Sequence, residues 1–195
     1  HARDLFAEAQ KQEREGNWSG ALDTLKQVAA IKLTPGIQYH MALCREKLGQ
    51  LVEAYKDYQA AERDAAQQNV QDVLQAVRGP LAALKDKVAR LKITVPSDVR
   101  DAKVLVDGAA LDPGSFGVEI PVLPGDHRIE ASLPGRSFDS GKVSPKAGEI
   151  LQVLVIFPKV GDTKPVPAPV PTPAPSNTTP AQPAPQTTPA QTPTS

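Results

Sequence analysis

The first part of the chain carries apolar residues every three or four positions, which is the spacing of one face of an α-helix. The stripe is clearest at Ala21, Leu25, Val28 and Ala29. Glycine and proline residues interrupt the pattern at intervals, and such residues end helices. The pattern predicts four helices, over residues 3–15, over residues 19–33, from about residue 37 and from about residue 52.

The four predicted helices form two copies of one unit, because similar residues recur at an offset of 33 positions. Small alanines let two antiparallel helices approach closely, and glycine allows the left-handed backbone conformation that ends a helix. A large side chain two residues after each glycine is expected to pack between the helices. The matched pairs are Ala9 with Ala42, Gly16 with Gly49, Trp18 with Leu51, Ala21 with Ala54, Leu25 with Tyr58, and Val28 with Ala61.

These matched residues resemble the tetratricopeptide repeat. The resemblance implies stacked antiparallel α-hairpins in which the first helix of each pair lines a concave groove for a protein or peptide partner. Phe6 and Tyr39 have a second interpretation, in which they pack against the third helix pair or the β domain. The groove-facing, partner-binding positions that the resemblance implies are Arg3, Phe6, Gln10, Glu13, Arg14, Tyr39, Leu43, Glu46 and Lys47.

A further apolar 3–4 spacing runs through residues 70–91 and predicts a helix that caps the two hairpins. Gly79-Pro80 lies inside it and is expected to kink the helix. The helical domain is therefore predicted to span residues 1–91.

From Lys92 the pattern changes to short alternating stretches separated by glycine and proline turns. Asp107-Gly108 is a strong hairpin signal. Short strands with frequent turns predict a small β-sandwich over residues 92–157, so the fold class is α+β with more than one domain. The predicted strands are 92–95, 103–107, 118–122, 127–131, 142–143 and 151–157.

The β region resembles a PEGA domain, a small β-sandwich of bacterial envelope and surface proteins. The matching features are a strand ending in Asp107-Gly108, the turn Pro124-Gly125 followed by His127, and the turn Pro134-Gly135. Tetratricopeptide-like hairpins joined to such a domain are similar to exported proteins of myxobacteria and their relatives. The resemblance implies a location in the periplasm or cell envelope, after removal of a signal peptide.

The last 38 residues, from Pro158, hold 12 of the 20 prolines, few charges and no aromatic residue. Such a composition cannot bury enough apolar surface to fold, so we expect an extended, disordered linker rich in proline and threonine. Because a linker usually connects two parts, we expect the native chain to continue past Ser195, for example into a membrane anchor.

Composition and motifs weigh against several kinds of chemistry. Lys and Arg total 22, as do Asp and Glu, and no basic stretch indicates nucleic-acid binding. No run of 18 apolar residues predicts a membrane span, and the single Cys44 cannot form an intramolecular disulfide. We expect no catalytic residues, no metal and no cofactor. The alternative of a calcium site formed by Asp107, Asp112 and Asp126 stays open, although turns favour aspartate anyway.

Two functional hypotheses follow. The first is a non-enzymatic scaffold outside the cytoplasm that binds a protein or peptide through its helical repeats, with the β domain as a spacer or second binding surface. The second is a module that binds a cell-wall or surface-layer carbohydrate through the β domain. The shortage of aromatic side chains in the β region counts against the second hypothesis, because sugar sites usually offer stacking rings.

Overall fold

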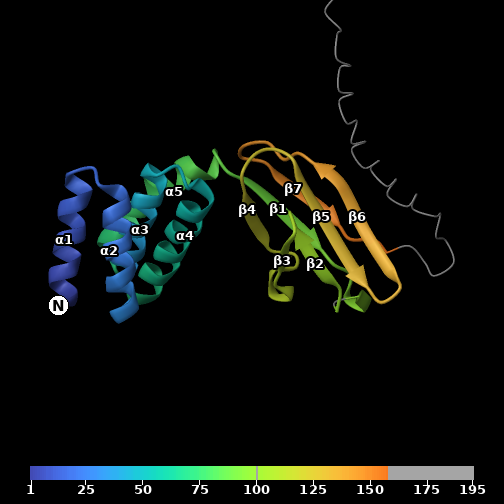
Figure 1. Ribbon diagram of the computed structural model, residues 1–195, viewed down its shortest axis with the longest axis horizontal. Coiled ribbons are helices and arrows are strands. Elements are labelled where there is room, and N and C mark those ends of the chain that lie inside the picture. Colours follow the sequence, from blue (N-terminus) through green and yellow to red (C-terminus); the bar gives the residue numbers. More distant parts are fainter. Residues whose placement is uncertain (100, 158–195) are drawn as a thin grey trace, which may run out of the picture. The chain divides into compact units, whose positions relative to one another are not determined.

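The computed structural model describes residues 1–99 and 101–157. It contains α-helices followed by two β-sheets, which confirms the predicted α+β layout (Figure 1). The predicted linker lies outside the described residues. The helices are α1 (Ala2–Arg14), α2 (Trp18–Ile31), α3 (Pro35–Lys47), α4 (Leu51–Gln68) and α5 (Gln71–Lys85).

Local capping sets where these helices begin. The side chain of Asn17 precedes α2 and accepts a hydrogen bond from the Gly20 N–H at 3.1 Å. The Thr34 hydroxyl precedes α3 and accepts from the Ile37 N–H at 3.3 Å. Pro35 occupies the first helical position, where its missing N–H leaves no intrahelical bond unmade, so α3 begins two residues before the predicted start.

The two hairpins match at the offset of 33 residues in the backbone of the turn and in the burial of the alanines. Gly16 and Gly49 both have φ +76°, in the left-handed region that favours glycine. Ala9 and its match Ala42 are both fully buried. A larger side chain at either position would therefore push the paired helices apart. The sequence prediction of two matched hairpins is therefore confirmed for α1–α2 and α3–α4.

Polar contacts between the paired helices also follow the repeat. The Thr24 hydroxyl on α2 donates to Gln12 on α1 at 3.1 Å. At the positions 33 residues later, Arg45 on α3 donates to Asp57 on α4. The same point of the hairpin thus carries a neutral hydrogen bond in one copy and an ion pair in the other.

The capping helix is shorter than predicted. It continues through Pro80 but ends at Lys85, and strand β1 (Ala89–Thr94) begins three residues before the expected domain boundary. Pairing with a distant segment decides this boundary, because the Arg90 N–H donates to the Glu149 carbonyl at 2.8 Å. The prediction that residues 89–91 are helical is therefore wrong.

Two sheets make up the β region. One has the strand order β4-β1-β7, with β1 antiparallel to β4 and parallel to β7. The other is antiparallel with the order β3-β2-β5-β6. The remaining strands are β2 (Lys103–Val106), β3 (Ala109–Leu111), β4 (Glu119–Val122), β5 (His127–Leu133), β6 (Arg136–Val143) and β7 (Ile150–Leu154).

The predicted hairpin at Asp107-Gly108 is confirmed and joins β2 to β3. Both turn residues have positive φ, +51° and +80°, as a two-residue hairpin of this kind requires. Strand β3 itself was not predicted, because Ala109 and Ala110 have no strand preference and are exposed. The sheet recruits this segment through backbone pairing with β2.

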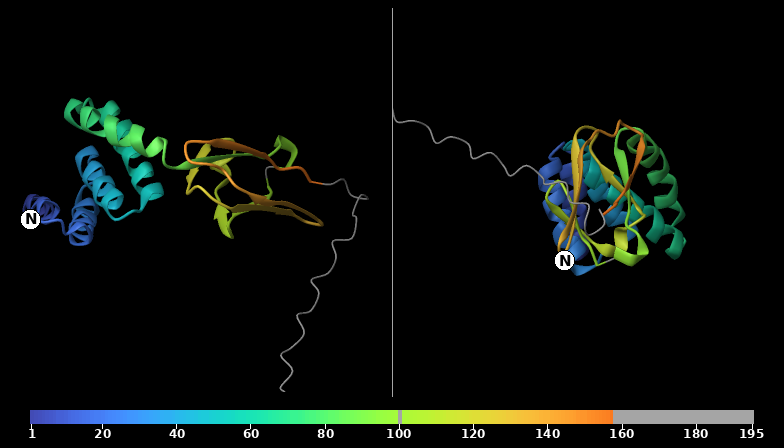
Figure 2. Two further views of the ribbon diagram at one scale, coloured as in Figure 1. Left: turned by 90° about the horizontal axis from the view of Figure 1, so that it is seen from above. Right: turned by 90° about the vertical axis from the view of Figure 1, so that its right-hand side faces the viewer.

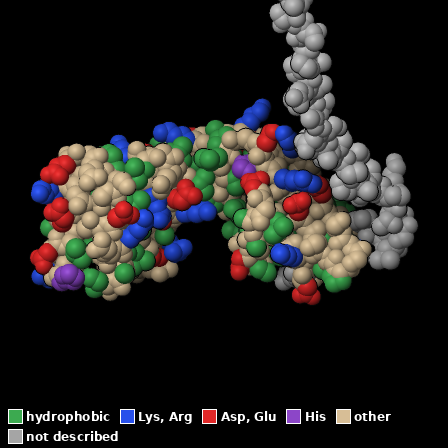
Figure 3. Space-filling model, in the orientation of Figure 1, with side chains coloured by type: hydrophobic (Ala, Val, Ile, Leu, Met, Phe, Trp, Pro, Cys, Tyr) green, Lys and Arg blue, Asp and Glu red, His purple; other side chains and the backbone are tan. Residues whose placement is uncertain are grey.

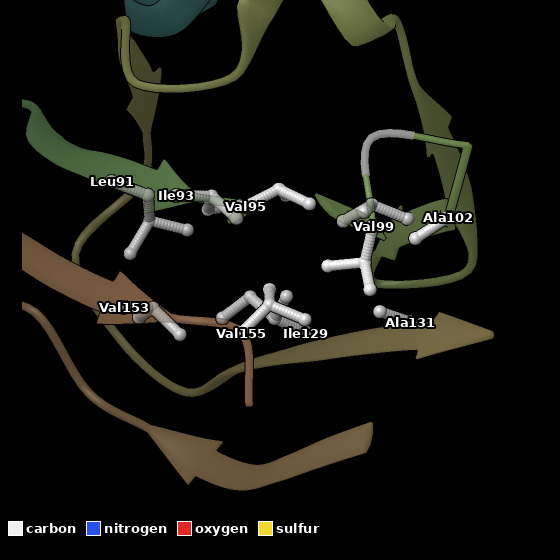
Figure 4. Close-up of a cluster of buried hydrophobic side chains, with 10 residues drawn as sticks. Leu91, Ile93, Val95, Val99, Ala102, Ile129, Ala131, Val153 and Val155 are labelled. Atoms are coloured by element: carbon white, nitrogen blue, oxygen red, sulfur yellow. The ribbon is translucent and has the colours of Figure 1, made fainter. Parts of the chain in front are cut away.

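A shared apolar core lies between the two sheets, which form two layers (Figure 2). Leu91 and Ile93 contribute from β1, Val153 from β7, and Ile129 and Ala131 from β5. Their side chains point toward one another in Figure 4, and all are buried. A sandwich architecture follows, as predicted.

No helix among the described residues is both long enough and apolar enough to cross a membrane. Over the face seen in Figure 3, positive and negative side chains are interspersed, and hydrophobic ones lie scattered between them.

Candidate functional site

An aromatic row crosses from α1 to α3. The ring of His40 lies between Phe6 and Tyr39, with edge-to-face centroid distances of 5.2 and 5.3 Å. Tyr39 in turn lies 5.9 Å from Tyr58 on α4. Phe6 and Tyr39 are half-buried, so each packs against a hairpin core with one side and faces outward with the other. Phe6 packs against the core of the first hairpin, and Tyr39 against the core shared by the second hairpin and α5.

Glu13 holds α1 against α3. Its carboxylate accepts a hydrogen bond from His40 Nδ1 at 2.9 Å and from the Cys44 thiol at 3.5 Å, and its side chain is only 10% exposed. Burial raises the pKa of Cys44 to about 12, and the negative charge of Glu13 adds to that effect. Cys44 is therefore an unreactive thiol at neutral pH. Glu13 is used inside the repeats rather than presented to a partner.

The second repeat uses its matching carboxylate in a similar way. Glu46 accepts a hydrogen bond from the Tyr58 hydroxyl at 3.0 Å. Burial raises the pKa of Tyr58, and the nearby charge of Glu46 raises it further. Lys47, close by on α3, has its ammonium group 6.0 Å from the centroid of the Trp18 ring. Glu46 and Lys47 thus have partners within the fold.

All nine residues predicted to face the groove lie on α1 or α3, the first helices of the two hairpins. The structure joins Phe6, Glu13 and Tyr39 through His40, which was not among the predicted groove positions. Its contacts with Phe6 and Glu13 come from a separate helix, so no local signal could have revealed them. Three of the nine are exposed and six are half-buried: Arg3, Arg14 and Lys47 in the first group, and Phe6, Gln10, Glu13, Tyr39, Leu43 and Glu46 in the second.

A cavity of about 300 Å³ opens at one end of the first hairpin, where α1 begins and α2 gives way to α3. Phe6, Val28 and Ile37 provide apolar walls, and Arg3 and Lys32 provide the charged groups. We call this cavity the hairpin-end pocket. Its lining residues are Ala2, Arg3, Phe6, Val28, Lys32, Thr34, Gly36 and Ile37.

Exposed apolar side chains neighbour this pocket in the sequence. Ile31 and Leu33, on either side of Lys32, are each 55% exposed. The position that matches Ile31 in the second repeat is Asp64, which accepts a hydrogen bond from Gln38 at 2.8 Å. An apolar surface at this end is therefore a property of the first hairpin and not a requirement of the repeat. Sequence reasoning included these residues in the second helix and missed their exposure.

The outer face of α1 is polar where the matching face of α3 is apolar. Ile37 and Cys44 on α3 are buried against the first hairpin, whereas the matching residues of α1, Asp4 and Lys11, are exposed. The apolar surface of the first hairpin is thus concentrated at its end rather than spread along α1.

The β region has a cavity of a different kind, with a volume of about 340 Å³. Its lining is charged, and the charges are paired: His127 with Asp107 at 2.7 Å, Lys142 with Asp126 at 3.1 Å, and Arg128 with Asp139. Among the described residues no group of three or more His, Cys, Asp and Glu side chains is placed to hold a metal ion.

His127 joins two turns of this region. Its Nδ1 contacts Asp107 at 2.7 Å and its Nε2 contacts the Leu123 carbonyl at 2.6 Å, so both nitrogens face acceptors. Burial alone would lower the pKa of His127, but these hydrogen bonds and the charges of Asp107 and Asp126 raise it above its ordinary value. The arrangement favours the imidazolium, in which both nitrogens donate. These contacts tie the turn between β2 and β3 to the loop before β5.

Comparison with protein-family models, with curated proteins and with solved structures finds no match to this chain.

Proposed function

We propose that this protein is a non-catalytic scaffold that binds a protein or peptide through its helical hairpins. The observation that carries the proposal is the hairpin-end pocket with the exposed Ile31 and Leu33 beside it in the chain. Exposed apolar side chains and apolar pockets are both features of surfaces that bind other proteins. The aromatic row of Phe6, His40 and Tyr39 extends the candidate surface from α1 onto α3.

The proposal includes the two resemblances. The matched backbone angles at Gly16 and Gly49 and the buried alanines at the same offset support the tetratricopeptide-like interpretation. The Asp107-Gly108 hairpin and the hydrogen bonds of His127 support the PEGA-like interpretation. Both agree with an exported bacterial protein whose β region acts as a spacer or second binding surface. Fractionation of cells that produce the native protein tests that location.

The carbohydrate hypothesis has less support, because the cavity at His127 is lined by paired charges rather than by stacking rings. We therefore do not advance it as a second function.

Selection of random dodecapeptides displayed on phage, with the full chain as bait, tests the proposal. We expect enriched peptides whose binding is lost in the double variant Ile31→Glu, Leu33→Glu. The matched control is Leu154→Glu, Ile156→Glu, which changes two apolar residues of the β region that are 53% and 63% exposed. Binding that survives the first variant and is lost in the second would refute the proposal, as would a selection that enriches no peptide.

A further inference from the structure

The charge of the hairpin-end pocket is one-sided. Arg3 and Lys32 are its only charged lining residues, and both are positive. Neither forms an ion pair with any other residue that the structure describes. The neighbouring Asp4 is exposed and does not line the pocket. Two cations without partners at an apolar pocket favour an anionic group on the ligand.

The backbone adds to this preference, because α3 begins at the pocket. Gly36 and Ile37 belong to the first turn of this helix, which has 13 residues. The Thr34 hydroxyl accepts a hydrogen bond from the Ile37 N–H, whereas the Gly36 N–H has no acceptor among the described residues. Helix starts carry partial positive charge and offer N–H groups to anions.

The apolar walls of the pocket favour a ligand that carries an apolar group as well as an anion. Phe6, Val28 and Ile37 line an open apolar hollow of about 300 Å³, which suits one large side chain such as leucine or phenylalanine. A ligand that satisfies both features carries an apolar side chain next to a carboxylate. A peptide does this when an apolar residue has acidic neighbours.

We propose that the hairpin-end pocket binds an acidic peptide segment, with one large apolar side chain between Phe6 and Ile37 and adjacent carboxylates at Arg3 and Lys32. The proposal rests on the proposed function and specifies the chemistry of the partner. It places the anchor at the end of the hairpin, so that most of the positions predicted to line the groove are not part of the contact.

Three fluorescent decapeptides of defined sequence test the chemistry by titration into the full chain. The probe is GSGEFEGSGS, in which glutamates flank phenylalanine. Its matched controls are GSGKFKGSGS, which reverses the charge, and GSGEAEGSGS, which removes the anchor. We expect saturable binding of the probe alone, and shifts of the Arg3, Phe6 and Ile37 amide signals in nuclear magnetic resonance spectra. Equal binding of either control would overturn the proposal.

A pair of charge-matched variants tests the location. We expect Arg3→Gln, Lys32→Gln to weaken binding of the probe about 5- to 20-fold, since two charged contacts are removed. Arg14→Gln, Lys47→Gln removes the same charge from elsewhere on α1 and α3 and should change binding less than twofold. Equal weakening by both variants would mean non-specific attraction and would refute the site.

The two proposals fail differently. If phage selection enriches peptides that bind at Tyr39 and Leu43 instead, the hairpin-end pocket is refuted and the scaffold function stands. If neither selected peptides nor the probe bind the full chain, both proposals fall.

Discussion

Gly16 and Gly49 should respond alike to replacement by alanine, because each ends the first helix of its hairpin with φ +76°. A Cβ added at either position meets no other atom within 4 Å, so no clash contributes to the cost. Only the backbone conformation opposes the new side chain. The effect of Gly16→Ala and Gly49→Ala therefore reports the left-handed turn by itself.

The magnitude follows from two opposing terms. The left-handed conformation costs a non-glycine residue about 1–2 kcal/mol. Alanine also restricts the unfolded chain, which returns about 0.4–1 kcal/mol of stability. We expect each substitution to lower the free energy of unfolding by about 1 kcal/mol, and the two values to agree within about 0.5 kcal/mol.

Gly36 supplies the matched control. It lies in the first turn of α3 without a positive φ, and its added Cβ would meet only the Thr34 hydroxyl, at 4.0 Å. In Gly36→Ala the only effect is that alanine restricts the unfolded chain. The substitution should therefore raise the free energy of unfolding by a few tenths to about 1 kcal/mol.

Urea unfolding followed by the fluorescence of Trp18 measures all three variants, since this is the single tryptophan and it lies in the first hairpin. For a denaturant slope of about 2 kcal/mol per molar, the midpoint falls by about 0.5 M for Gly16→Ala. The same sign of change for Gly16→Ala and Gly36→Ala would refute the reasoning. A large difference between Gly16→Ala and Gly49→Ala would refute the equivalence of the hairpins.

Three further predictions concern stability. Leu25→Ala, at a fully buried position, should cost about 2–5 kcal/mol in urea unfolding, whereas Ile31→Ala, at an exposed one, should stay within about 0.5 kcal/mol; similar losses would contradict the assigned burial. Tyr58→Phe should cost about 1–2 kcal/mol in the same assay through loss of the hydrogen bond to Glu46, and an unchanged midpoint would argue against that bond. The pKa of His127 is raised in the folded state, so protonation of this side chain stabilises the fold. The contribution is fully present below the unfolded-state pKa of about 6.5 and is lost as the pH rises through the folded-state pKa. Unfolding between about pH 6 and 9 should therefore show a decline in stability that is smaller in His127→Gln, and equal declines would refute the assignment.

Local sequence patterns determined much of the fold because their causes are local. The helices follow from apolar spacing along one face, and their ends from residues such as Gly16 and Gly49 that tolerate left-handed backbone. The hairpin at Asp107-Gly108 follows from the positive φ that these two residues accept. The offset of 33 residues predicted how the helices pair, because similar residues at matching positions of the two repeats pack in the same way.

Contacts between distant segments decided the rest. Strand β1 begins at Ala89 because the Arg90 N–H donates to the Glu149 carbonyl, and β3 exists because β2 offers it hydrogen bonds. His40 acquires its role from Glu13, which is 27 residues earlier in the chain. The hairpin-end pocket needs α1, α2 and α3 to meet at one place. Periodicity predicts which face of a helix is buried, but the meeting of three helix ends and the charges left there depend on tertiary packing alone.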